Sequence, residues 1–157
     1  KKALQSSAMK AADLQLIIVA TLSPDNTFPN TASAVQSKLG APQAACFSIE
    51  AGCTGFVYAL EVAAGMIASG LYKNALIIGA EKLSSVVDWT DRTTCVLFGD
   101  GAGAAIITAV DVKDNTYLGS DLGSNGDMHG SLHIPAGGCA VPISSFFPTR
   151  ICVIFIR

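Results

Sequence analysis

The sequence predicts an α/β protein with a mostly parallel sheet, and three observations support this prediction. Short apolar segments rich in β-branched residues recur along the chain, as is typical of strands covered on both faces. Segments with helical spacing separate the first three of them. Half of the 157 residues are apolar and only 14% are charged, which is the composition of a protein with a substantial buried core.

The first part of the chain alternates helix and strand. Residues 3–13 have apolar side chains near helical spacing and predict the end of a helix, and the run LQLIIVAT at 14–21 predicts a buried strand. A turn at 23–26 follows. Asn30 or Thr31 can cap a helix that Gly40 ends. The apolar run at 44–50 then predicts a second strand.

Residues 54–69 predict a helix of unusual composition. Apolar side chains surround nearly its whole circumference, and Glu61 is its one charged residue. A helix that is apolar all round is expected to be buried all round, so that other layers cover it on more than one side. Gly70 marks its end.

The second part of the chain has more polar loops. Residues 74–81 (NALIIGAE) predict a third strand, followed by a polar loop at 82–94. A tight glycine turn is expected at 99–103, before a fourth strand at 104–110. No helix separates the last two strands, which predicts an antiparallel edge. Residues 117–122 are a candidate fifth strand.

Charge and cysteine content argue against several classes of function. A formal net charge of −2, without a run of Lys or Arg, argues against a nucleic-acid partner. No apolar run is long enough to cross a bilayer, so no membrane partner is expected. The five cysteines are odd in number and fit no zinc spacing. We therefore expect free thiols, no metal site and a reducing, cytoplasmic setting.

The candidate nucleophile is Cys53, which stands between a strand and the apolar helix in the run AGCTGF. A thiol at a helix N-terminus meets unpaired backbone N–H groups and the positive end of the helix dipole. Both favour the thiolate, which is the nucleophilic form. The small neighbouring residues leave room for a substrate carbonyl. The alternative is a buried structural cysteine, which behaves as a small hydrophobe.

Three segments stand out in their order and spacing: FSIEAGCTGFVYAL at 47–60, GAEKL with DWTDR between 79 and 92, and LFGDGAGAA at 97–105. Together they resemble the β-ketoacyl-[acyl-carrier-protein] synthase III family of condensing enzymes. The resemblance covers the middle part of the N-terminal half of a family member. It implies a thiolase-like layered fold. Residues 1–145 would form one incomplete half of that fold, with a buried nucleophile helix, and residues 146–157 would be an unmatched tail.

The resemblance implies a reaction and its substrates. An acyl-CoA, usually acetyl-CoA, acylates Cys53 and releases CoA. Malonyl-acyl-carrier-protein then loses carbon dioxide, and the resulting carbanion attacks the acyl-cysteine to start fatty-acid biosynthesis. The Cys53 backbone N–H would form one arm of an oxyanion hole. The family is an acyltransferase without a further cofactor, and it is a homodimer joined through the strand at 44–50.

The resemblance also implies substrate-binding residues. Arg92 matches the arginine at the adenine end of CoA, where a guanidinium can stack on a purine and pair with phosphate. Phe28 matches a residue that reaches into the acyl pocket of the partner subunit, and Leu83 and Phe98 match residues that line the pocket. Each also has a simpler explanation: a solvated arginine, a loop hydrophobe packed on its own domain, and ordinary core.

Two parts of the family pattern find no match in these residues. The family uses a Cys–His–Asn set, but His129 and His133 lie in a Gly/Ser-rich stretch unlike the catalytic motif. We therefore expect the chain alone to be inactive in condensation. The family's first strand would precede Lys1 and separate the strands at 14–21 and 74–81. Residues 151–156 are a candidate to fill that position.

Two alternatives to this family remain open at the level of sequence. One is another thiolase-fold synthase, of the hydroxymethylglutaryl-CoA or polyketide type, which uses a similar cysteine. The other is a non-catalytic fragment that only folds or assembles.

Overall fold

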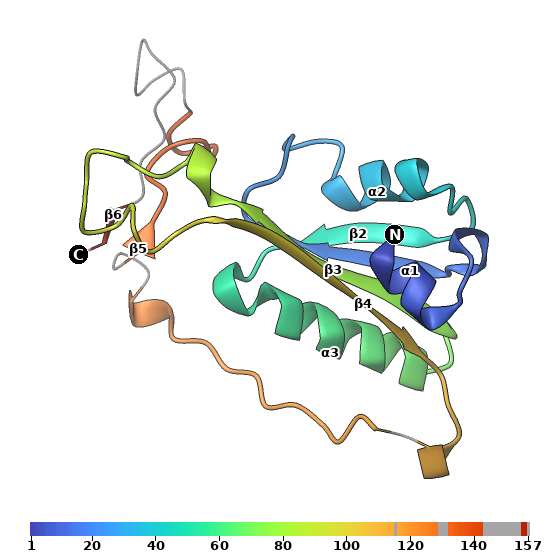
Figure 1. Ribbon diagram of the computed structural model, residues 1–157. Helices are drawn as coiled ribbons and strands as arrows, with labels where there is room; N and C mark the ends of the chain where they lie inside the picture. Colours follow the sequence, from blue (N-terminus) through green and yellow to red (C-terminus); the bar gives the residue numbers. More distant parts are fainter. Residues whose placement is uncertain (115, 129–131, 143–154, 157) are drawn as a thin grey trace. The chain divides into compact units, whose positions relative to one another are not determined.

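The computed structural model describes residues 1–114, 116–128, 132–142 and 155–156, and it confirms the α/β class. Within these residues, one sheet has the strand order β2-β1-β3-β4, and β5 pairs with β6 separately (Figure 1). The strands are β1 Leu16–Ala20, β2 Ala45–Ile49, β3 Asn74–Lys82, β4 Asp100–Thr108, β5 Leu132–His133 and β6 Phe155–Ile156. The α-helices are α1 Lys2–Ser7, α2 Thr31–Leu39 and α3 Gly55–Ala68, and the 3₁₀ helices are η1 Ala11–Asp13, η2 Gly52–Thr54, η3 Leu83–Ser85, η4 Val112–Asp114 and η5 Gly126–Met128.

The chain divides into two compact units. The first consists of Lys1–Glu81 and Ala102–Leu122, and it holds the three α-helices and most of the larger sheet. The second consists of Lys82–Gly101 and Gly123–Arg157, and it holds η3 and the polar segment that follows.

Strand β1 is the centre of the core in the first unit. It pairs in parallel with β2 on one side and β3 on the other, so that Ile18 lies opposite both Phe47 and Ile77. Its five residues are all buried. Ile17 clusters with Ala32 of α2, whereas Ile18 clusters with residues of α3. Because α2 covers one face of the sheet and α3 the other (Figure 1), this strand is apolar along its whole length.

The ends of α2 follow the sequence prediction. Asn30 caps the helix, and its side-chain oxygen accepts a hydrogen bond from the Ser33 N–H at 2.9 Å. Gly40 ends the helix with a φ of 70°, a left-handed conformation that favours glycine. Both signals are local, which explains why the sequence alone predicts the boundaries.

The expected vacant position between β1 and β3 does not exist. Four consecutive residue pairs, from Ile17–Leu76 to Ala20–Gly79, join the two strands directly. Residues 151–154 lie outside the described part of the chain, and Phe155–Ile156 pair with Leu132–His133 in the separate sheet. The prediction was wrong because the two strands satisfy each other's backbone groups without an intervening strand.

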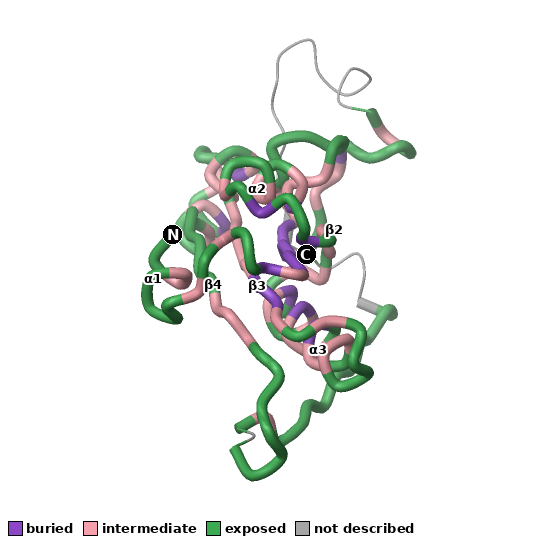
Figure 2. The backbone as a smooth tube through the Cα atoms, turned by 90° about the vertical axis from the view of Figure 1, so that its right-hand side faces the viewer, coloured by how far each residue is buried: buried purple, intermediate pink, exposed green. Residues whose placement is uncertain are grey.

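Helix α3 is buried on one face, and the expectation of all-round burial was wrong. Gly55, Ala59 and Ala63 form the buried stripe, whereas Val57 and Val62 remain 47% and 37% exposed. Figure 2 shows buried and exposed stretches side by side along α3. Among the described residues, the sheet covers one face of this helix, and Tyr117 contacts it at Glu61. Val57 and Val62 are left partly exposed.

Strand β4 begins earlier than predicted, because residues 99–103 do not form a tight turn. The strand includes Gly101 and Gly103. The Ala109 N–H, just after β4, donates to the carbonyl of Lys73, just before β3, so the two strands run in opposite directions (Figure 1). The predicted antiparallel edge is confirmed. Glycine weakens the interior of a strand, but pairing with β3 keeps these residues extended, and the sequence alone does not reveal that pairing.

Residues 117–122 form no strand, contrary to prediction. The Tyr117 hydroxyl donates a hydrogen bond to the Glu61 carboxylate on α3. This segment therefore contacts a helix and adds no strand to the sheet edge.

Candidate active site

Cys53 lies in η2, the short turn between β2 and α3. It directly precedes Thr54, the N-cap of α3. The side chain is exposed, unlike that of a buried structural cysteine. The first backbone N–H groups of a helix have no acceptor within the helix, so the thiol stands beside donors that can stabilise negative charge.

The turn that carries Cys53 is shaped by its neighbours. The Gly52 N–H donates to Glu50 Oε1 at 2.8 Å, and Thr54 Oγ1 donates to the carbonyl of Ala51 at 3.0 Å. Gly52 has a φ of 52°, which side chains other than glycine rarely adopt. These contacts turn the chain sharply from the strand into the helix.

Helix α3 begins in close contact with β1. A Cβ atom added at Gly55 would lie 3.1 Å from the Cβ of Ala20, which is closer than ordinary packing allows. A Cβ atom added at Gly79 would lie 3.4 Å from the Phe56 ring. Gly55 therefore lets the start of the helix sit directly on the sheet and fixes Cys53 relative to the strand ends, whereas a side chain at Gly79 would make only ordinary contact.

The carboxyl ends of three parallel strands meet at this place. Ala20 of β1 is paired with Ile49 of β2 and with Gly79 of β3, and the Thr21 N–H donates to the Ile49 carbonyl at 3.1 Å. In α/β proteins, ligands bind beyond the carboxyl ends of parallel strands. Cys53 follows β2 at this edge.

Glu81 is a polar residue at the same edge to which the sequence analysis gave no role. Its Oε1 accepts a hydrogen bond from the Leu22 N–H at 2.9 Å, and its Oε2 accepts one from the Ser23 hydroxyl. The available signal was a carboxylate that directly follows the apolar run of β3. Sequence alone does not show which distant group that carboxylate binds.

Phe28 lies in the connection between β1 and α2, and its side chain is 88% exposed. The simpler explanation, a loop hydrophobe packed on its own domain, does not fit this exposure. The structure places Phe28 and Cys53 in the same compact unit, on segments that follow neighbouring strands.

Arg92, Leu83 and Phe98 all belong to the second unit. Arg92 is exposed, and Leu83 and Phe98 are partly buried. The structure thus brings the three together in one compact unit, and it places Cys53 and Phe28 in the other.

Short-range hydrogen bonds shape the turn that presents Arg92. Asp91 Oδ1 accepts from the Thr93 N–H at 2.9 Å and from the Thr93 hydroxyl at 2.6 Å. Asp91 Oδ2 accepts from the hydroxyl of Thr94, a residue that is almost fully buried. The hydrogen bonds from Thr93 and then Thr94 lower the pKa of Asp91. Arg92 therefore projects from a turn tied together by an ionised carboxylate.

A second carboxylate acts in the same way just before this turn. Asp88 Oδ1 accepts from the N–H and hydroxyl of Thr90, and the hydroxyl contact lowers its pKa most. The Trp89 ring N–H donates to the Ser84 carbonyl, and Asp100 accepts from both the N–H and the hydroxyl of Ser84. Polar contacts therefore tie this segment together beside its buried residues Val87 and Thr94.

Other candidate groups are placed as follows. His133 lies in β5, and His129 falls outside the described residues. Cys46, Cys53, Cys95 and Cys139 are free thiols, as predicted for the cysteines that the structure describes. In the same residues, no group of three or more His, Cys, Asp or Glu side chains could hold a metal ion.

None of the helices in the described ranges combines the length and the apolar character that a membrane span requires.

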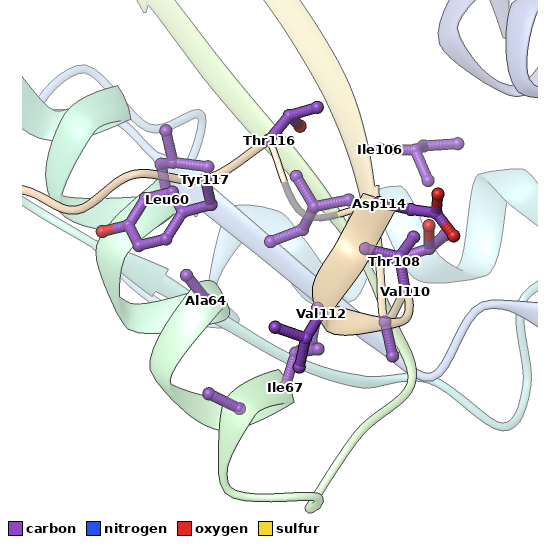
Figure 3. A pocket seen from close by; sticks show the side chains of 13 residues that line it. Leu60, Ala64, Ile67, Ile106, Thr108, Val110, Val112, Asp114, Thr116 and Tyr117 are labelled. Atoms are coloured by element: carbon purple, nitrogen blue, oxygen red, sulfur yellow. The ribbon is translucent and has the colours of Figure 1, made fainter.

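A cavity of about 590 Å³ lies along the second half of α3, away from Cys53 (Figure 3). Its apolar lining includes Leu60 and Ile67 of the helix and Ile106 of β4, and Tyr117 closes one side. Hydrogen bonds from Ser120 and then Tyr117 lower the pKa of Glu61 beside it. Cys53 stands before the first turn of a helix that is about 21 Å long, so this cavity is not the site of the thiol.

Comparison with known proteins identifies similar sequences. Residues 47–126 match the model of the family described as 3-Oxoacyl-[acyl-carrier-protein (ACP)] synthase III. The chain is 50% identical over 144 residues to β-ketoacyl-[acyl-carrier-protein] synthase III of Caldanaerobacter subterraneus subsp. tengcongensis. It is 51% identical over 142 residues to the same enzyme of Natranaerobius thermophilus. These matches cover 92% and 89% of the chain but only 43% of each relative's length.

Solved structures give the same result for the fold. The enzyme of this name from Aquifex aeolicus superposes with a TM-score of 0.81 at 47% identity, and covers 85% of this chain and 43% of that one. The Thermus thermophilus enzyme superposes with a TM-score of 0.82 at 34% identity. This match covers 98% of this chain and 46% of that one. A priming β-ketosynthase from the R1128 polyketide pathway superposes with a TM-score of 0.80 at 28% identity. This match covers 98% of this chain and 45% of that one. The chain therefore has the layered fold of these enzymes, over less than half of their length.

Proposed function

Because the chain belongs to the 3-oxoacyl-[acyl-carrier-protein] synthase III family, we propose that Cys53 accepts the acyl group of an acyl-CoA, with acetyl-CoA as the expected donor. The observation that carries the proposal is the exposed Cys53 thiol at the start of α3, beyond the carboxyl ends of β1, β2 and β3. In the complete protein, this acyl transfer is the first half of a condensation that starts fatty-acid biosynthesis.

The proposed acyl transfer uses the sulfur and the backbone N–H of Cys53. The Cys53 sulfur attacks the thioester carbonyl, whose oxygen gains negative charge as the new C–S bond forms. The Cys53 backbone N–H is proposed to donate to this oxyanion, a contact of the kind that contributes about 3 kcal/mol in other enzymes. The bond to CoA then breaks, its electron pair leaves with the CoA sulfur, and CoA takes up the proton that the Cys53 thiol has lost.

The second half-reaction is proposed for the complete protein and not for these 157 residues. Malonyl-acyl-carrier-protein would lose carbon dioxide, and its carbanion would attack the acyl carbon on Cys53 and release the sulfur. The family supports that step with a histidine and an asparagine. Neither His129 nor His133 stands in the matching motif. We expect no β-ketoacyl product from the chain alone, and a measurable product would contradict this expectation.

The substrate-binding residues complete the proposal. Arg92 would contact the adenine end of CoA, Leu83 and Phe98 would line the acyl pocket, and Phe28 would enter the pocket of the partner subunit. Strand β2, an edge strand of the sheet, would join the two subunits of a dimer. The chain is about 50% identical to two relatives named β-ketoacyl-[acyl-carrier-protein] synthase III and 28% identical to the polyketide priming enzyme, which favours the first kind of synthase.

The test is mass spectrometry of the chain after incubation with acetyl-CoA, with the adduct mapped to a residue. We expect an acetyl group on Cys53 and none after Cys53→Ala. Cys139→Ala is the matched control, because Cys139 is also an exposed free thiol, and this variant should be acetylated like the wild type. Acetylation of Cys139 to the same extent as Cys53, or of neither, would refute the proposal.

A further inference from the structure

The connection between β1 and α2 is attached at both ends and exposed between them. Thr21 is buried, whereas residues 24–29 are all exposed. At the far end, Asn30 caps α2, and the Ala32 N–H donates to Ser48 Oγ of β2 at 3.2 Å. The path of the exposed segment (the blue loop between β1 and α2 in Figure 1) therefore depends on where its two ends are fixed.

Glu81 fixes the near end of this loop from another strand. One carboxylate oxygen accepts the Leu22 N–H and the other accepts the Ser23 hydroxyl. The Ser23 N–H also donates to Thr21 Oγ1 at 3.2 Å, which completes the turn. A carboxylate that holds two successive residues fixes the direction of the chain as well as its distance from β3.

Phe28 follows five residues after Ser23, and its side chain is 88% exposed. Burial against its own unit does not hold this ring, so its position follows from the path of the loop backbone. Five residues span at most about 17 Å. A displacement at Ser23 is therefore transmitted to Phe28 over a short distance.

We propose that Glu81 is a positioning residue that sets acyl-chain preference by holding the loop that carries Phe28. This inference rests on the proposed function, in which Phe28 of one subunit limits the acyl pocket of the other. Glu81 acts through the loop and not on the reacting atoms. If the anchor is weakened, Phe28 gains freedom to move aside, and longer acyl chains are accepted more readily.

The experiment measures the rates at which acetyl-CoA and hexanoyl-CoA acylate Cys53, and compares the ratio of the two rates between variants of the chain. Glu81→Gln should raise the hexanoyl-to-acetyl ratio at least about three-fold and leave the acetyl rate within about two-fold of the wild type. Ser23→Ala should shift the ratio in the same direction. Ser23→Thr keeps the hydroxyl and should keep the wild-type ratio, which a general loss of stability would not reproduce.

A double-mutant cycle shows whether Glu81 acts through Phe28. In a Phe28→Ala background, Glu81→Gln should cause no further change in the ratio, because the ring that the loop positions is gone. An unchanged ratio in Glu81→Gln, or an equal effect with and without Phe28, would overturn this inference. Absence of any adduct on wild-type Cys53 would instead overturn the proposed function. If Glu81→Gln fails to fold, as judged by circular dichroism, the Ser23 pair decides the question.

Discussion

The two compact units hold their candidate site residues by different forces. In the first unit, Cys53 stands at the start of a helix packed against a strand with no exposed surface in Leu16, Ile17, Ile18 and Val19. In the second unit, Arg92 stands in a turn held by Asp91, through hydrogen bonds between residues two or three apart in the chain. Packing of this kind is difficult to disturb and insensitive to pH, whereas hydrogen bonds to a carboxylate depend on its ionisation. The difference predicts that the two units respond to different perturbations.

The largest effect should come from a cavity in the first unit. Ile18→Ala removes a fully buried side chain from the middle of β1, and we expect a loss of about 2–5 kcal/mol in the free energy of unfolding. Val57→Ala, at a half-exposed position of α3, is the control and should change it by less than about 0.5 kcal/mol. Urea denaturation measures both. Equal effects would show that the core does not determine the stability of this unit.

The contact between α3 and β1 can be tested with two glycines of the same helix. At Gly55 a Cβ atom would press on Ala20, and β1 has no room to yield, so Gly55→Ala should cost about 1 kcal/mol or more. At Gly65 the space is open, and Gly65→Ala should stabilise the chain by about 0.5–1 kcal/mol through helix propensity. Thermal unfolding reports the sign of each change. Stabilisation by both substitutions would argue against close packing at the start of α3.

The second unit should respond locally to the loss of one carboxylate. Asp91→Asn keeps a single acceptor oxygen for Thr93 and Thr94, so amide exchange at Thr93 should accelerate by roughly three- to ten-fold. Exchange at Ile18 should not change. Asp25→Asn, an exposed aspartate of the first unit, is the control. Faster exchange throughout the chain would contradict a local role for Asp91.

The smallest effect is a response of the same turn to acid. The lowered pKa values of Asp88 and Asp91 mean that their hydrogen bonds stabilise the turn fully above the ordinary value of 3.8. This stabilisation is lost as the pH falls through the lowered values. Amide chemical shifts of Thr90 and Thr93 should therefore titrate with midpoints below 3.8. The same residues in the urea-unfolded chain should titrate near the ordinary value, and identical midpoints would contradict the prediction.

Sequence predicted the features that depend on neighbouring residues. The ends of α2 follow from Asn30 and Gly40, and the place of Cys53 follows from a strand, a small-residue turn and an apolar helix in direct succession. The features that it missed depend on distant partners. The direct pairing of β1 with β3 and the anchoring of the loop by Glu81 each join segments almost sixty residues apart. Nothing within either segment identifies the other.

The position of β1 also has a consequence for the order in which the chain folds. Its first neighbour, β2, emerges from the ribosome about thirty residues later, and its second neighbour, β3, about sixty residues later. The edge of β1 that pairs with β3 thus lacks this partner until β3 has been synthesised, and such non-local pairing is slow to form. Nascent chains stalled before residue 74 should therefore be aggregation-prone and retained by chaperones, and release should follow once β3 has left the exit tunnel.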